Sequence, residues 1–130
     1  MGSEPTEILK DGIQYWHIND KLHREDGPAR IYPDGSEEWY INDVLHREDG
    51  PAVIDEGESP NKVWYIHGKI HRLDGPAVIW EVSGERQWYI NGHYVTDQIT
   101  EWAKDRDIDL NNLTEMDKMI IQLEWGNYGK

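Results

Sequence analysis

The sequence predicts a mainly β protein with an α-helical C-terminus, an antiparallel meander of β-hairpin repeats of about 24 residues. The repeats are expected to form an elongated single-layer sheet capped by two short helices. An eight-residue phrase, LHREDGPA, stands at 22–29 and 45–52, and a near copy, IHRLDGPA, stands at 70–77. Tryptophans recur at intervals of 23, 25 and 24 residues, at Trp16, Trp39, Trp64 and Trp88. After residue 96 the apolar period changes from two residues to 3.6.

Each repeat is expected to contain one hairpin. The Trp-Tyr-Ile run reads as a strand, and the dipeptide that follows it tolerates the positive φ of a tight turn. These dipeptides are Asn-Asp, His-Gly or Asn-Gly. In the Asp-Gly-Pro that comes later, glycine is expected to supply an unusual backbone angle, and proline, which has no N–H, to open the second strand. Return loops of unequal length explain the unequal spacing of the tryptophans.

The chain is expected to form one compact unit, with a flexible N-terminus at 1–11, a repeat sheet at 12–96 and a helical cap at 97–130. The first helix should run from Asp97 to Arg106, with Ile99, Trp102, Ala103 and Arg106 on one face. The second should begin at a capping box in TEMD, 114–117, and end at Gly126. Its expected apolar stripe is Met116, Met119, Ile120 and Leu123.

Helices at the end of an array usually cover its open edge, and we expect this pair to do so. The alternative is that the helical pair, with Trp102 and Trp125, binds the partner.

Charge and composition exclude several classes of function. Lys and Arg number 13 against 26 Asp and Glu, a formal charge of -13, which disfavours direct binding to nucleic acids or membranes. Cysteine is absent, so no disulfide or thiolate metal site is expected. No apolar run approaches the length of a signal peptide or membrane span, and we expect a cytoplasmic protein without a cofactor.

The repeat is similar to that of the MORN-like β-hairpin repeat proteins, in the WYxNGxxHRxDGPA variant of uncharacterised proteins from large phages and giant viruses. The residues that carry the resemblance in the second repeat are Trp39, Tyr40, Asn42, His46, Arg47, Asp49, Gly50, Pro51 and Ala52. The resemblance covers about two thirds of the chain. It implies an elongated single-layer sheet that holds partners rather than catalyses, and a viral product acting on a host factor. Membrane-associated members are richer in glycine and basic residues, so lipid binding is not implied here.

The His-Arg-x-Asp motif of the repeated phrase is the main candidate for chemistry, because histidine and carboxylate groups bind metals and transfer protons. Its copies should form a ladder with about 10 Å between equivalents rather than a cluster. We therefore expect a structural latch, with His or Arg bonding the turn Asp or a backbone carbonyl of the next repeat. The latch residues are His23, Arg24, Asp26, His46, Arg47, Asp49, His71, Arg72 and Asp74. Metal binding and catalysis are the alternatives.

Aromatic and acidic rows are the candidate partner-binding groups. The tryptophans share one face of the sheet and are expected to stack as core, while Tyr40, Tyr65 and Tyr89 share the other and suit recognition. The acids Glu37, Glu38, Asp55 and Glu56 read as solvated loop residues that would attract a basic partner.

The leading functional hypothesis is a non-enzymatic protein-interaction module, a phage or viral protein that binds and inhibits a host protein, such as a defence protein, in the host cytoplasm. An acidic mimic of nucleic acid is a special case of it. The alternatives are a small-molecule or nucleotide sponge that uses Trp and Tyr stacking, and an enzyme that uses a His/Asp pair.

Overall fold

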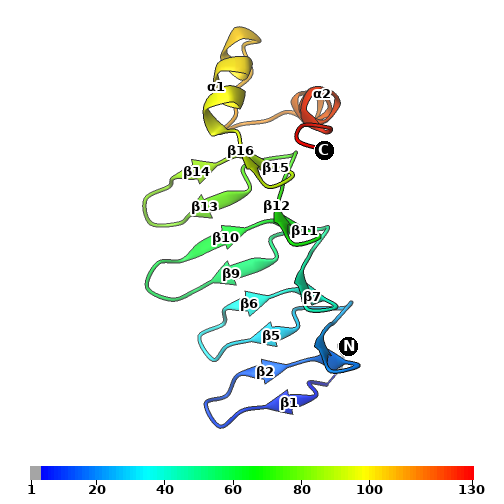
Figure 1. Cartoon of the computed structure of the whole chain (residues 1–130). Helices are drawn as coiled ribbons and strands as arrows, with labels where there is room; N and C mark the ends of the chain where they lie inside the picture. Colours follow the sequence, from blue (N-terminus) through cyan, green and yellow to red (C-terminus); the bar gives the residue numbers. More distant parts are fainter. Residues whose placement is uncertain (1–3) are drawn as a thin grey trace.

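The computed structural model describes residues 4–130, and its largest element is an antiparallel sheet of eight strands in sequential order (Figure 1). Each repeat contributes two of these strands, so the sheet grows along one axis and the molecule is elongated. The strands are β1 (Glu7–Ile8), β2 (Gln14–Tyr15), β5 (Arg30–Ile31), β6 (Glu37–Glu38), β9 (Val53–Asp55), β10 (Asn61–Val63), β13 (Val78–Trp80) and β14 (Arg86–Gln87). The predicted mainly β meander with two C-terminal helices is confirmed.

Beside this sheet stands a column of four small hairpins, which the sequence did not predict as separate elements. They are β3 (His17–Ile18) with β4 (Lys21–Leu22), β7 (Tyr40–Ile41) with β8 (Val44–Leu45), β11 (Tyr65–Ile66) with β12 (Lys69–Ile70), and β15 (Tyr89–Ile90) with β16 (His93–Tyr94). Each full repeat therefore has two hairpins instead of one. The chain turns at the tryptophan, which lies between two strands: Trp39 donates its N–H to the Ala52 carbonyl and accepts from the His46 N–H. The bond to Ala52 ties the corner to the main-sheet side, and the bond from His46 closes the small hairpin.

The turns of the small hairpins have the predicted backbone. Asn42 and Asp43 have φ of 49° and 65°, and His67 and Gly68 have 48° and 79°. Two successive positive φ angles define the hairpin turn whose twist matches the strands. Asn, Asp and Gly tolerate this region best, which is why the dipeptides predicted it.

The Asp-Gly-Pro bends differ from the prediction in their backbone. Strands flank all three bends as expected, but Gly27, Gly50 and Gly75 are not among the residues with positive φ. A Cβ on Gly50 would lie 2.9 Å from Cζ of Arg47, and equivalent atoms at Gly27 and Gly75 would meet Arg24 and Arg72. Glycine is needed there because a guanidinium group packs against the bend, and the expected unusual angle is corrected accordingly.

Two helices, α1 (Thr96–Asp105) and α2 (Glu115–Trp125), close the last repeat. The capping box of Thr114 and Asp117 is confirmed, and α2 ends at Gly126. On α1, Ile99 and Ala103 are buried as predicted. The principal core joins both helices to the fourth repeat, and its members are Trp88, Ile90, Val95, Ile99, Ile121 and Trp125.

The predicted apolar stripe of α2 is wrong for three of its four residues, and the fourth, Ile120, is half-buried. Met116, Met119 and Leu123 are exposed by 64%, 58% and 82%, whereas Ile121 and Trp125 are buried. Both faces of α2 carry apolar residues, so periodicity alone did not identify the face that packs on the fourth repeat.

The N-terminal boundary also needs correction. The sheet begins at β1, whose Glu7 and Ile8 pair with Tyr15 and Gln14, inside the segment expected to be flexible. Residues 1–3 of that segment lie outside the described residues. Between residues 4 and 130, neither helix has the length and apolar character needed to cross a bilayer.

Candidate functional site

The arginine of each repeated phrase forms a clasp within its own repeat. Arg47 lies 3.8 Å above the centroid of the Trp39 ring, donates from Nε to Asp49 Oδ1 at 2.9 Å, and donates from Nη1 to the Pro51 carbonyl at 3.0 Å. Arg24 and Arg72 make the same contacts with Trp16 and Trp64. A planar guanidinium is suited to stack and to donate in its own plane at once. The clasp holds the bend against the tryptophan, so Trp16, Trp39 and Trp64 each lie against the arginine of their own repeat.

The histidine of the phrase links neighbouring repeats. Nδ1 of His23, His46 and His71 accepts the backbone N–H of Asn42, His67 and Asn91 at 3.0, 2.9 and 2.8 Å. The expected bonds to the turn Asp and to a carbonyl are thus made by the arginine within its own repeat, whereas the link to the next repeat is made by histidine, which accepts from a backbone N–H. Because Nδ1 accepts, the ring proton of the neutral histidine is on Nε2.

Two ionisable groups of the latch, His71 and Asp49, have pKa values shifted by their surroundings. Burial, with a smaller contribution from the charge of Lys130, lowers the pKa of His71. The hydrogen bond from Arg47, followed by the positive charge of that group, lowers the pKa of Asp49. In each copy the aspartate pairs with the arginine two residues before it, as Asp26 does with Arg24, Asp49 with Arg47 and Asp74 with Arg72. Among residues 4–130, no three His, Asp or Glu side chains gather into a metal-binding group.

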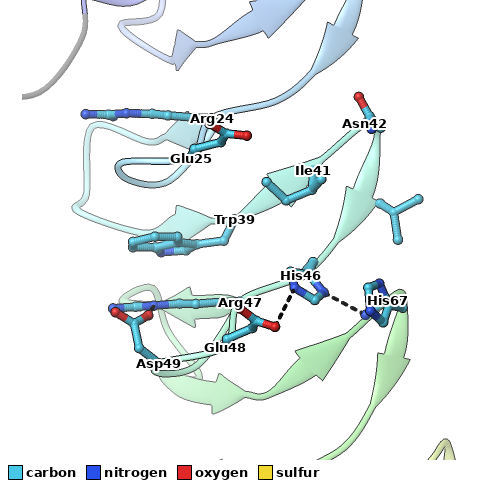
Figure 2. Close-up of a pocket in the computed structure, with 11 residues that line it drawn as sticks. Arg24, Glu25, Trp39, Ile41, Asn42, His46, Arg47, Glu48, Asp49 and His67 are labelled. Atoms are coloured by element: carbon cyan, nitrogen blue, oxygen red, sulfur yellow. Dashed lines mark hydrogen bonds and ion pairs between the residues drawn. The ribbon is translucent and has the colours of Figure 1, made fainter.

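A groove of about 830 Å³ opens between the bend of the first repeat and Trp39 of the second. Figure 2 shows the Arg24 side chain facing the Trp39 ring across this groove, with Arg47 on the other side of the ring. Ile41 and Val44 add apolar surface to the lining, and Val44 is 42% exposed. The groove therefore combines an aromatic and aliphatic floor with charged walls.

Carboxylates line this first groove. Glu25 and Glu48 have side chains that are 83% and 82% exposed. Figure 2 marks the contacts that connect Glu48 to His46 and His46 to His67. His46 Nε2 lies 3.9 Å from Glu48 Oε1, and the His46 and His67 rings lie 4.5 Å apart.

The same construction recurs one repeat further on. A second groove of about 580 Å³ is lined by Trp64, Ile66 and Glu48, with Gln122 of α2 among its lining residues. In the fourth repeat the corresponding Trp88 and Ile90 are 3% and 0% exposed, because they belong to the core that includes α2. The open grooves and the closed site are successive copies of one arrangement.

The predicted recognition groups occupy several environments. Tyr40, Tyr65 and Tyr89 are half-buried, and burial raises the pKa of Tyr40 and Tyr65. The Tyr89 ring meets Tyr94 edge-on at 5.3 Å. Trp102 packs against the core of the cap, edge-on to Trp125 at 6.0 Å and beneath Arg106.

The four acids predicted as solvated loop residues are not equivalent. Glu37 and Glu38 form β6 and are half-buried: Glu38 accepts from Arg30 at 2.6 Å, and Glu37 accepts from Trp39 Nε1 at 3.3 Å. Asp55 ends β9 and accepts from the Gly57 N–H at 2.8 Å. Glu56 is exposed. The loop interpretation is thus corrected for the first three.

Sequence reasoning did not identify the grooves or the residues Glu25, Glu48, Ile41 and Ile66 that line them. The sequence did contain one signal: the position held by Glu25 and Glu48 in the first two copies of the phrase is Leu73 in the third. Leu73 packs against the core that α2 completes.

The fold and these sites define a capped β-hairpin repeat array with polar latches and open grooves. No family model, curated protein or solved structure matches this chain.

Proposed function

We propose that this protein is a non-enzymatic protein-interaction module. The observation that carries the proposal is the contrast between the latch and the grooves. The repeated Arg and Asp groups are bonded within their repeats, and the histidines are bonded between repeats. The aromatic grooves are open and have exposed carboxylates along them. A repeated surface of this kind suits contact with a large partner, because such binding depends on the contact area and not on a single reactive group.

The narrower proposal is that the chain is a phage or viral product that binds and inhibits a host protein in the host cytoplasm. Its support is the resemblance of the repeated phrase to viral hairpin-repeat proteins, together with the net charge of -13, which favours partners with basic surfaces.

A capture experiment tests the proposal. Tagged protein is incubated with lysate of the candidate host, bound proteins are identified by mass spectrometry, and the recovered partner is remeasured in pure form. Rising salt should slow association, because exposed charges are screened over about 8 Å at physiological ionic strength.

Two sets of variants locate the contact. Tyr40→Ala with Tyr65→Ala should raise the dissociation rate if the tyrosine face binds. Glu56→Lys with Glu58→Lys should slow association, and these exposed residues are preferable to Glu38, which is needed for the Arg30 pair. Failure to bind any partner protein, or turnover of a substrate that is lost in His46→Ala, would contradict the proposal.

A further inference from the structure

Three successive repeats present the same three positions to one side of the column of hairpins, and only the last set is covered. Trp88, Ile90 and Leu73 pack with α2, and Ile90 is fully buried. Their counterparts Trp64, Ile66 and Glu48 line the second groove, and Trp39, Ile41 and Glu25 line the first. Among the described residues, these three repeats therefore give one occupied and two open versions of a single packing site.

The occupied site shows what fits. From α2, Ile121 and Trp125 supply the buried apolar face, and they are one helical turn apart. Gly126, at the end of the helix, lies against Leu73: a Cβ there would be 3.8 Å from Leu73 Cδ1. The closed site is therefore covered by a helix that presents an apolar stripe and has its C-terminal end beside Leu73.

The open sites differ from the occupied one at the position of the phrase that Leu73 holds, and Leu73 itself also lines the second groove. Where the closed site has Leu73, the open ones have Glu48 and Glu25, whose side chains are more than four-fifths exposed. Glu48 lines both grooves. A segment that packs there as α2 does would place the end of its helix against a carboxylate, so a basic residue is favoured at that point.

The spacing of the repeats also suits a helix. Two strands per repeat give a rise of about 10 Å, and packed helices lie about 8–10 Å apart. A helix in the second groove would thus lie beside α2. Gln122 of α2 lines that groove, and Met119, three residues earlier on the same flank, is 58% exposed. The second groove thus reaches α2 at Gln122, and its lining combines the apolar Trp64 and Ile66 with the acidic Glu48.

We propose that the grooves bind a basic amphipathic helix of a partner protein, seated on the Trp and Ile of a repeat in the way that α2 is seated on Trp88 and Ile90. This inference rests on the proposed function and adds to it the binding surface and the class of partner segment.

The probe is a fluorescein-labelled synthetic peptide with the sequence of residues 113–128 and the substitutions Gln122→Lys, Glu124→Lys and Gly126→Lys. The matched control peptide has the same charge but carries Ile121→Ser and Trp125→Ser in addition. Binding to the full chain is measured by fluorescence anisotropy at physiological salt, so that long-range attraction to the acidic protein is screened.

The probe should bind saturably, and the serine control should bind at least about tenfold more weakly, because it lacks the two groups that bury apolar surface. Glu48→Lys in the protein should weaken binding of the probe by about fivefold or more. Glu101→Lys, the same change of charge at an exposed position of α1 away from both grooves, should change it by less than about twofold.

The proposal is overturned if the probe does not saturate, if the serine control binds equally well, or if Glu48→Lys and Glu101→Lys have equal effects. The last two results would indicate attraction by net charge alone. None of these results contradicts the proposed function if the protein still captures a partner in the lysate experiment and the tyrosine or loop variants weaken that capture. Conversely, saturable binding of the probe supports the groove proposal even if the capture experiment recovers no partner from the lysate.

Discussion

Replacing Gly50 by alanine in the central repeat should destabilise the protein through Arg47 and not through the backbone. The φ of Gly50 is outside the left-handed region, so alanine is allowed there by the backbone itself. Its Cβ would, however, lie 2.9 Å from Cζ and 3.1 Å from Nε of Arg47. The guanidinium must then leave its position between the bend and the Trp39 ring.

The magnitude follows from the contacts that this movement breaks. The bond from Arg47 to the Pro51 carbonyl is worth about 1 kcal/mol net, and the stack on Trp39 about 0.5–1 kcal/mol at a partly exposed site. Alanine restricts the unfolded chain and returns about 0.4–1 kcal/mol. We therefore expect Gly50→Ala to lower the free energy of unfolding by about 1 kcal/mol.

The assay is urea unfolding followed by tryptophan fluorescence, performed on Gly50→Ala, Arg47→Ala and the double variant. With Arg47 truncated the obstruction is gone, so Gly50→Ala should become neutral or slightly stabilising in that background. The coupling between the two changes is then about 1–2 kcal/mol, above the scatter expected for independent sites. An equal cost of Gly50→Ala in both backgrounds would refute the steric explanation and point to the backbone.

Three further outcomes are expected. His46→Ala should lower the free energy of unfolding by about 1 kcal/mol, because the His67 N–H loses its acceptor, while a chelator should leave the melting temperature unchanged; a chelator-induced fall would favour a metal site instead. Since the folded-state pKa of His71 is lowered, the unfolded chain takes up the proton first, and stability present above about pH 6.5 should be lost as pH falls toward the folded pKa. The free energy of unfolding, measured by urea titration, should fall more between about pH 7.5 and about pH 5.5 in the parent chain than in His71→Gln. An equal fall in both would exclude this histidine as the cause. Thr114→Ala should cost about 1 kcal/mol through loss of the capping box, which thermal unfolding can measure against Thr100→Ala as a control within α1.

The local features were predictable because short-range sterics decide them. Asn42-Asp43 and His67-Gly68 give hairpin turns because such residues accept positive φ, and Thr114 with Asp117 begins a helix because both satisfy N–H groups within one turn. The repeated phrase likewise predicted that each repeat of the meander has an equivalent bend at the same position. These conclusions need only neighbours in the chain.

The functions of particular side chains were decided by residues far away in the sequence. Gly50 reads as a turn glycine until Arg47 is seen against it, and α2 has two apolar faces until Trp88 and Ile90 select Ile121 and Trp125. In the sequence, the replacement of Glu48 by Leu73 in the next copy of the phrase has no evident reason. The structure supplies one, because Leu73 packs against the core that includes α2. Sequence alone determined the repeated unit and its turns; which surfaces remain open depended on where the C-terminal helix packs, because burial is a property of the assembled chain.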